Sequence, residues 1–183
     1  MKVLVVGQGL AGSCMALTLL DRGIDLHIAD YQVRNQSTSI AAGLVNPLVL
    51  KRMKMVWRAD EFVPFQEQFY ARWQEELSSL WRHSVPVYRR FHDIAEQNQW
   101  METSGSTVFS EYLSPALEPL PKGLRGAHGM GQVYHAGWFD TQSFMDSVRH
   151  YFSSVSRFKP IEVDDSTSSE FALVNWANGV RAR

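Results

Sequence analysis

The first 30 residues contain the pattern that most constrains the fold of this chain. An apolar strand, Val3–Val6, runs into the glycine-rich turn Gly7-Gln8-Gly9-Leu10-Ala11-Gly12, and a helix-length apolar segment follows. A second predicted strand then ends on Asp30. This order of strand, turn, helix, strand and acid is typical of a βαβ unit that binds a dinucleotide. We therefore predict a parallel βαβ unit with a nucleotide site at the turn.

Each part of this pattern has its own physical role. Gly7 permits a sharp exit from the strand, Gly9 allows close approach of a pyrophosphate, and Gly12 allows the helix to pack tightly on the sheet. The start of the helix near Leu10 directs N–H groups and a partial positive charge at the phosphates. The carboxylate of Asp30 can accept hydrogen bonds from ribose hydroxyls and would repel a 2′-phosphate, which disfavours NADP. The alternative is a βαβ unit that keeps its glycines for packing alone.

Composition limits the classes to which the chain can belong. It has 183 residues, 45% of them hydrophobic and 20% charged, which suits a globular protein with one domain of good size or two small ones. The formal net charge of −1 provides no field to attract nucleic acid or an anionic membrane. One cysteine, Cys14, forms no intrachain disulfide and fits a reducing, cytoplasmic location. No apolar run approaches the ~20 residues of a membrane span, and no metal site is predicted.

Residues 31–47 depart from an ordinary NAD-binding domain, in which a helix and a further strand would follow. The segment is small, polar and rich in turn-forming residues. The hydroxyls of Ser37 and Thr38 could cap a helix or donate to a phosphate. Ala42 and Gly43 would let the backbone lie against a flat ligand. The alternative is an ordinary loop that enters a short helix.

Hydrophobic periodicity predicts the elements that follow. Large apolar residues recur at spacings of three and four in residues 60–81, which predicts a helix with Pro64 in its first turn and one buried face. That face contains Phe62, Phe65, Phe69, Trp73, Leu77 and Leu80. Residues 132–138 alternate like a strand, and Asp140 or Thr141 is expected to cap the next helix.

The last part of the chain predicts strands at residues 157–163 and 170–176. Asn178-Gly179 then gives a strong hairpin signal, although only Val180–Arg183 remain for the returning strand. We therefore expect either a chain that is truncated relative to a complete fold or a partner chain that supplies the missing part.

Three segments together resemble the FAD-dependent D-amino-acid oxidase superfamily, in particular its glycine oxidase and D-amino-acid dehydrogenase branch. They are GQGLAG with Asp30, STSIAAGLVNP, and GQVYHAGWFDTQSFMDSV. The resemblance implies an α/β fold, in which a Rossmann-like FAD/NAD(P)-binding βαβ domain is combined with an α+β substrate domain of mixed sheet. We assign residues 1–80 to the first domain, which would be incomplete, and residues 81–183 to the second.

The resemblance also implies a set of residues that contact FAD. It places the pyrophosphate at Gly7, Gly9, Leu10, Ala11 and Gly12. It places the adenosine ribose at Asp30 and Tyr31. The stretch from the phosphates to the isoalloxazine would follow Ser37, Thr38, Ala42, Gly43 and Leu44. Val163 would contact the adenine through its backbone.

The implied reaction removes a hydride from the carbon that bears the amine of a small amine or amino acid, after which water hydrolyses the imine. In the family, the residues that bind the substrate carboxylate belong to a later half that this chain lacks, so no catalytic residue is predicted here. Two alternatives stay open at this stage. One is a flavin or NAD enzyme of another class that shares only the βαβ unit. The other is a non-catalytic nucleotide-binding module or subunit that needs a partner chain.

Overall fold

The computed structural model describes residues 2–31, 37–164 and 169–177. Contacts divide the chain into two compact units, each assembled from separate segments. The first unit consists of residues 1–42, 74–81 and 140–183, and the second of residues 43–73 and 82–139. Both units draw on residues from either side of position 80, where the sequence analysis placed a single boundary. The assignment of cofactor and substrate roles to separate domains stays a prediction.

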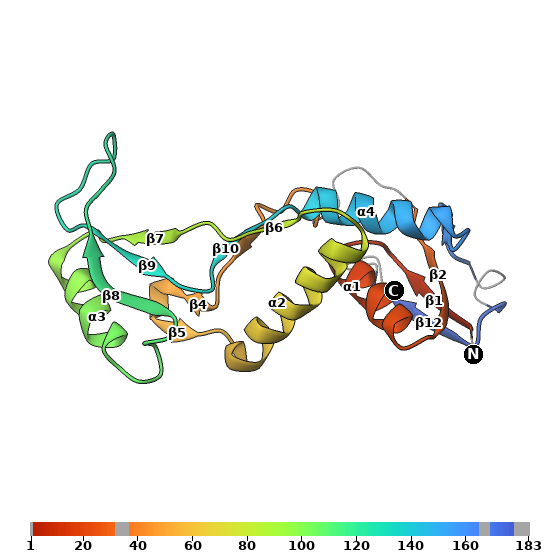
Figure 1. Cartoon of the computed structure of the whole chain (residues 1–183), viewed down its shortest axis with the longest axis horizontal. Helices are drawn as coiled ribbons and strands as arrows, with labels where there is room; N and C mark the ends of the chain where they lie inside the picture. Colours follow the sequence, from red (N-terminus) through yellow and green to blue (C-terminus); the bar gives the residue numbers. More distant parts are fainter. Residues whose placement is uncertain (1, 32–36, 165–168, 178–183) are drawn as a thin grey trace. The chain divides into compact units, whose positions relative to one another are not determined.

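A parallel sheet organises the first unit (Figure 1). Its strands are β1 (Lys2–Val6), β2 (Asp25–Ala29), β11 (Phe158–Lys159) and β12 (Leu173–Trp176), in the order β11-β2-β1-β12. Every described pairing in this sheet is parallel. Helix α1 (Leu10–Asp21) connects β1 to β2. This arrangement confirms the predicted α/β fold with a Rossmann-like βαβ unit.

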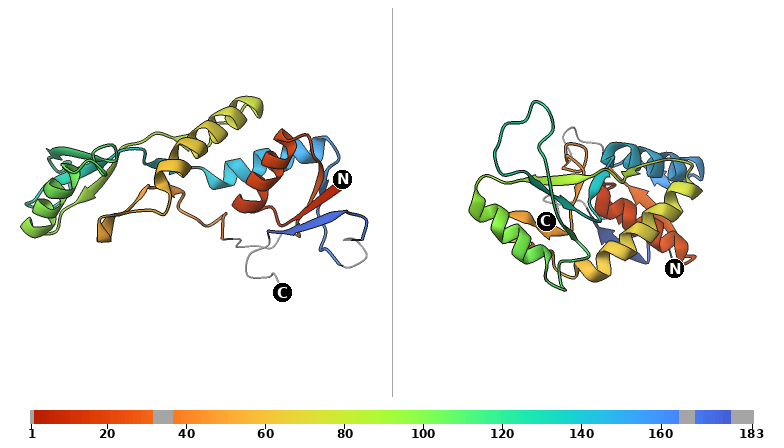
Figure 2. Two further views of the ribbon diagram at one scale, coloured as in Figure 1. Left: turned by 90° about the horizontal axis from the view of Figure 1, so that it is seen from below. Right: turned by 60° about the vertical axis from the view of Figure 1, so that its left-hand side comes forward.

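The central strand β1 is buried on both faces, as the unbroken run of apolar residues in its sequence favours. On one face, Leu4 and Val6 pack with Ala29 and Phe171. Alternation along the strand directs the other side chains to the opposite face. Helix α1 contacts both β1 and β2, and it also contacts α4 (Thr141–Ser154). Figure 2 shows these two helices lying side by side.

Helix α4 begins where its sequence predicts. The Asp140 carboxylate accepts a hydrogen bond from the backbone N–H of Ser143 at 3.0 Å, which satisfies one of the free donors of the first turn. The buried side chains of the helix recur at helical spacing and form its apolar face. The apolar ones are Phe144, Met145, Val148 and Phe152, and Thr141 in the first turn is buried as well.

The second unit is built from antiparallel strand pairs. One sheet has the order β3-β10-β6, another has the order β7-β9-β8, and β4 pairs with β5. The strands are β3 (Leu44–Val45), β4 (Leu48–Val49), β5 (Lys54–Met55), β6 (Arg82–His83), β7 (Val87–Arg90), β8 (Leu113–Glu118), β9 (Met130–Val133) and β10 (Gly137–Phe139). Every described strand pairing of this unit is therefore antiparallel, in contrast to the parallel sheet of the first unit.

The core of the second unit lies around α3 (Ile94–Ser104) and the β7-β9-β8 sheet. Its buried residues are Leu48, Phe91, Trp100, Tyr112, Leu113, Val133 and Ala136. The short 3-10 helix η1 (Leu50–Arg52) and residues 59–73 of α2 (Ala59–Glu76) complete the unit.

Helix α2 differs from its prediction in length and in its buried face. It ends at Glu76 instead of residue 81, and Pro64 is its sixth residue and so lies beyond the first turn. Phe62 and Phe65 are 44% and 63% exposed, whereas Val63 and Trp73 are buried. The spacing rule identified the helix and the burial of Trp73 but was wrong for Phe62 and Phe65, since aromatic side chains can pack on one another at the surface. Phe65 and Phe69, for example, stack with ring centroids 6.1 Å apart.

The predicted strand at residues 132–138 is also wrong, because it is two strands. β9 ends at Val133 and β10 begins at Gly137, with His135 between them in the left-handed region at φ 55°. Such a backbone conformation cannot continue a strand.

The strands near the C-terminus are shorter than predicted. β11 covers only Phe158–Lys159 of the expected 157–163, and β12 covers Leu173–Trp176 of the expected 170–176. β12 pairs in parallel with β1. The hairpin signal at Asn178-Gly179 lies outside the described residues. Among the described helices, none combines the length and apolar character needed to cross a bilayer.

Candidate functional site

Two positions of the glycine turn require glycine. The backbone conformation requires it at Gly7, and the lack of space for a side chain requires it at Gly12. Gly7 lies in the left-handed region at φ 95°, and its N–H donates to the Ala29 carbonyl at 2.8 Å. A Cβ on Gly12 would lie 1.9 Å from the Gly7 carbonyl oxygen. The backbone conformation of Gly7 and the packing of Gly12 therefore account for these two glycines without a nucleotide. Gly9 is different, since a Cβ there would meet only Thr38 Oγ1, at 3.1 Å.

The N-terminus of α1 carries backbone donors that the helix itself does not use. The first intrahelical hydrogen bond runs from Ser13 N–H to the Gly9 carbonyl at 2.9 Å. Leu10 N–H donates to Thr38 Oγ1 at 3.1 Å. The N–H groups of Ala11 and Gly12 have no hydrogen-bond partner in the described part of the chain. Two free donors and the positive end of the helix dipole fit an anionic phosphate.

Thr38 lies next to this turn although it follows Leu10 by 28 residues. Ser37, its neighbour, is exposed. Thr38 therefore brings a hydroxyl group to the start of α1. This placement suits a phosphate ligand, since Thr38 already occupies a hydrogen-bonding position beside Gly9.

Asp30 lies at the same edge of the sheet as the glycine turn. It follows directly after the last residue of β2, just as Gly7 follows β1, and ligands of open α/β sheets bind at the carboxyl ends of parallel strands. The residue is 7% exposed, and its N–H donates to the Lys159 carbonyl at 3.1 Å. Tyr31, which comes next, is 58% exposed.

Three further predicted residues have structural environments of their own. Gly43, at φ 71°, accepts a hydrogen bond from Phe139 N–H at 2.8 Å, and a Cβ there would lie 2.0 Å from the Phe139 carbonyl oxygen. Strand packing within the second unit therefore accounts for this glycine. Leu44 begins β3 and is largely exposed, and Ala42 is exposed in the first unit. The predicted contact of each with the flavin remains to be tested.

Val163 lies outside the strands of the first unit, four residues after the end of β11. It is partly buried and packs against the cluster that contains Leu4, Val6, Ala29 and Phe171. Its side chain therefore faces the protein interior, which leaves only its backbone for the predicted contact with adenine.

Sequence reasoning missed a buried polar side chain within the turn itself. Gln8 is 0% exposed, and its Nε2 donates to the Met145 carbonyl at 2.7 Å. Its Oε1 accepts a hydrogen bond from Arg149 Nε at 2.8 Å. No local pattern could have revealed this contact, because Gln8 and Arg149 are 141 residues apart.

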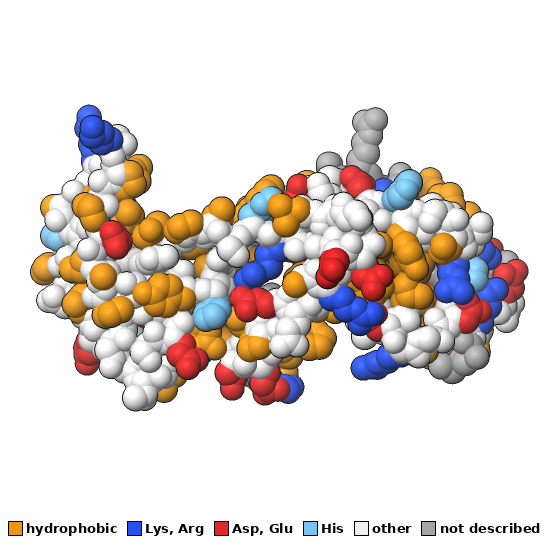
Figure 3. Space-filling model, in the orientation of Figure 1, with side chains coloured by type: hydrophobic (Ala, Val, Ile, Leu, Met, Phe, Trp, Pro, Cys, Tyr) orange, Lys and Arg blue, Asp and Glu red, His pale blue; other side chains and the backbone are white. Residues whose placement is uncertain are grey.

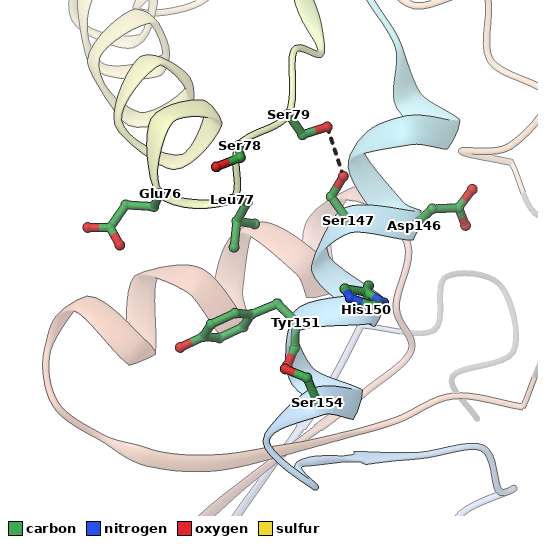
Figure 4. A pocket seen from close by; sticks show the side chains of 9 residues that line it. All are labelled: Glu76, Leu77, Ser78, Ser79, Asp146, Ser147, His150, Tyr151 and Ser154. Atoms are coloured by element: carbon green, nitrogen blue, oxygen red, sulfur yellow. Dashed lines mark hydrogen bonds between the residues drawn. The ribbon is translucent and has the colours of Figure 1, made fainter.

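A separate polar groove of about 510 Å³ lies in the first unit, between residues 76–79 and α4 (Figure 4). Ser147 Oγ at its edge contacts Ser79 Oγ at 3.0 Å and the Ser143 carbonyl at 2.8 Å, and accepts from Trp81 Nε1 at 3.1 Å. The lining residues are Glu76, Leu77, Ser78, Ser79, Asp146, Ser147, His150, Tyr151 and Ser154. None of them is a predicted FAD contact, so the candidate cofactor site is the edge formed by the turn and Asp30.

Comparison with solved structures shows the same fold in three amino acid or amine enzymes. An L-amino acid deaminase from Proteus vulgaris matches with a TM-score of 0.63 at 13% identity, over 86% of this chain and 39% of its own. A glycine oxidase from Geobacillus kaustophilus matches with a TM-score of 0.63 at 14% identity, over 86% and 45%. An iminodiacetate oxidase from Chelativorans sp. matches with a TM-score of 0.57 at 16% identity, over 86% of this chain and 45% of its own.

This chain therefore spans less than half of the length of each of these structures. The family model described as DAO, FAD dependent oxidoreductase, matches residues 2–154. That match includes the glycine turn, Asp30 and nearly the whole described chain. The chain belongs to the DAO family of FAD-dependent oxidoreductases.

Proposed function

We propose that this chain binds FAD at the glycine turn and forms the cofactor-binding part of an oxidoreductase that acts on an amine or amino acid. One observation carries the proposal. The N-terminus of α1 presents, beside Gly9, the N–H groups of Ala11 and Gly12, which have no partner among the described residues, at the sheet edge where Asp30 also lies. Donors for a pyrophosphate and an acceptor for a ribose thus occur at one edge of one sheet.

Different residues of the chain would bind different parts of the cofactor. The N–H groups of Ala11 and Gly12 would donate to the pyrophosphate beside Leu10, whose own N–H donates to Thr38 Oγ1. Gly9 would allow the pyrophosphate to approach because it has no side chain. The hydroxyls of Ser37 and Thr38 would add donors beside the same phosphates. The Asp30 carboxylate would accept hydrogen bonds from the ribose hydroxyls, with Tyr31 next to it.

The remaining assignments depend on the family resemblance. Ala42, Gly43 and Leu44 would follow the stretch toward the isoalloxazine, and the backbone of Val163 would contact the adenine. Bound FAD would supply a hydride acceptor for the carbon that carries the amine. The part played by this chain is to bind and orient the cofactor.

The matched enzymes and the charge of this chain support the proposed substrate class. The printed names of the three matched structures describe an amino acid deaminase, a glycine oxidase and an iminodiacetate oxidase. The formal net charge of the chain is −1, and basic and acidic side chains are interspersed on the face drawn in Figure 3. These features support a small amine or amino acid as the substrate, in preference to a polyanion.

An FAD titration of the purified 183-residue chain tests this function. We expect the chain to bind one FAD per molecule, with quenching or a spectral shift of the flavin on binding. Asp30→Asn should weaken this binding, because the amide is a weaker acceptor for the ribose than a carboxylate. A well-folded chain with no measurable uptake of FAD would rule out the proposal.

A further inference from the structure

We propose that Gln8 is a positioning residue for cofactor binding, because its buried amide fixes the glycine turn to α4. The inference rests on the proposed FAD site and adds to it a contact that lies outside the βαβ unit. It concerns the side chain between Gly7 and Gly9, which points away from the phosphate site and into the protein.

Both ends of the Gln8 amide are engaged. Nε2 donates to the Met145 carbonyl at 2.7 Å and lies 3.3 Å from Ser13 Oγ, while Oε1 accepts from Arg149 Nε at 2.8 Å. The side chain is completely buried. A buried amide that lost these partners would be left unsatisfied, so the turn is favoured in one position relative to α4.

The partners of Gln8 are themselves held in place. Met145 and Arg149 are four residues apart on α4 and so lie on the same face of the helix. The guanidinium of Arg149 lies over the Phe158 ring at 5.7 Å and 3.8 Å from the Asp146 carboxylate. Helix α4, β11 and the glycine turn are therefore joined through one glutamine and one arginine.

This contact has a consequence for the cofactor site. The donors of Ala11 and Gly12 bind phosphate well only if the turn is already in place, since ordering it on binding would reduce the affinity. Gln8 supplies that order from a helix that begins more than 130 residues later in the sequence. A merely structural role would change the stability of the fold and leave the affinity of the folded chain unaltered.

Gln8→Leu separates the two roles. Leucine has a similar volume but can form none of the three hydrogen bonds. We expect the dissociation constants for FAD and for ADP, which carries the pyrophosphate, each to rise about 10-fold by calorimetry well below the melting temperature. Gln97→Leu is the matched control, because it removes a similar bond, from Gln97 Nε2 to the His128 carbonyl at 3.0 Å, in the second unit. It should leave both constants unchanged.

A double-mutant cycle identifies the partner. Arg149→Leu should weaken FAD binding, and the variant with both substitutions should lose little more than Gln8→Leu alone, because the two residues share one bond. Additive losses would overturn the assignment of Arg149 as the partner. Unchanged affinity in folded Gln8→Leu would overturn the positioning role itself.

Amide hydrogen exchange distinguishes a failure of this inference from a failure of the proposed function. In Gln8→Leu without any ligand, the amides of Gly7 and Ser13, which donate to Ala29 and Gly9, should exchange faster than in the parent chain. Exchange at the parent rate would overturn the inference even if FAD binds the parent chain. Faster exchange together with no FAD uptake by the parent chain would support the anchoring of the turn and reject the cofactor.

Discussion

The two units of this protein use buried polar side chains differently. In the first unit, Gln8 joins the glycine turn to a helix 137 and 141 residues away. In the second unit, Ser104 donates to Met101, and Ser114 Oγ accepts from the N–H of Ala116, both within three residues. The first unit thus uses buried polarity to join distant segments at its candidate site, whereas in the second unit these serines satisfy the local backbone. A change at Gln8 should therefore affect ligand binding, and changes at these two serines should affect stability alone.

Gly12→Ala should have the largest effect of the changes considered. The new Cβ would lie 1.9 Å from the Gly7 carbonyl oxygen, so α1 or the turn would have to move. We expect destabilisation of about 3 kcal/mol or more, at the upper end of overpacking changes, with loss of FAD binding. Thermal unfolding followed by circular dichroism measures it. Gly105→Ala, where a Cβ makes only ordinary contacts of 3.6 Å, is the control, and an equal effect of the two changes would contradict this account.

Asp30→Asn should have the next largest effect, and this effect should appear in ligand affinity. The loss of charged hydrogen bonds to the ribose should weaken FAD binding by about 1.5 kcal/mol or more, which is at least tenfold. Calorimetry with FAD measures the change. Parent-like affinity in this variant would remove Asp30 from the site.

In the second unit, the change to compare with Asp30→Asn is Asp93→Ala. Asp93 caps α3 by accepting a hydrogen bond from Glu96 N–H at 2.8 Å. Its loss should reduce the free energy of unfolding by about 1 kcal/mol and leave FAD affinity unchanged, because the role of the cap is structural. A chemical denaturation curve and an FAD titration on the same sample measure both quantities. Weaker FAD binding by folded Asp93→Ala would break the contrast between the units.

The smallest expected effect is a difference between the two units in how the free energy of unfolding depends on pH. Burial and then the charge of Lys2 lower the pKa of His27 in the first unit below its usual value of 6.5. The unfolded chain therefore binds the proton more readily than the folded chain, so stability should fall as pH drops from about 6.5 toward the lowered pKa. His27→Leu should remove this slope in thermal unfolding, and an unchanged slope would assign it to another group.

Glu96 in the second unit should respond at a lower pH. Burial raises its pKa, but hydrogen bonds from His92 N–H and Arg89 outweigh burial and leave the pKa below its usual value of 4.5. The stability that this carboxylate contributes is therefore present above about 4.5 and is lost as pH falls through the lowered pKa. Glu96→Gln should reduce the acid sensitivity below that pH and leave the slope near pH 6 unaltered.

The sequence predicted features that are determined by neighbouring residues. The strand–turn–helix–strand order from Val3 to Asp30 and the Asp140 cap are local patterns, and both are confirmed. The predicted burial of Phe62 and Phe65 on α2 and the continuous strand at residues 132–138 were wrong, because packing at the surface and the left-handed backbone of His135 are decided by tertiary context. The contact between Gln8 and Arg149 could not be predicted, because its residues share no pattern.

The most direct test of the central claim compares FAD binding by Gly9→Ala and by Gly105→Ala. A Cβ on Gly9 would lie no closer than 3.1 Å to Thr38 Oγ1, so the variant should fold, while the methyl group would obstruct the approach of a pyrophosphate. We predict that folded Gly9→Ala, in which Thr38 Oγ1 must shift slightly to admit the methyl group, loses at least tenfold in FAD affinity, and that Gly105→Ala matches the parent chain. Equal FAD affinities for the two folded variants would contradict the phosphate site at this turn.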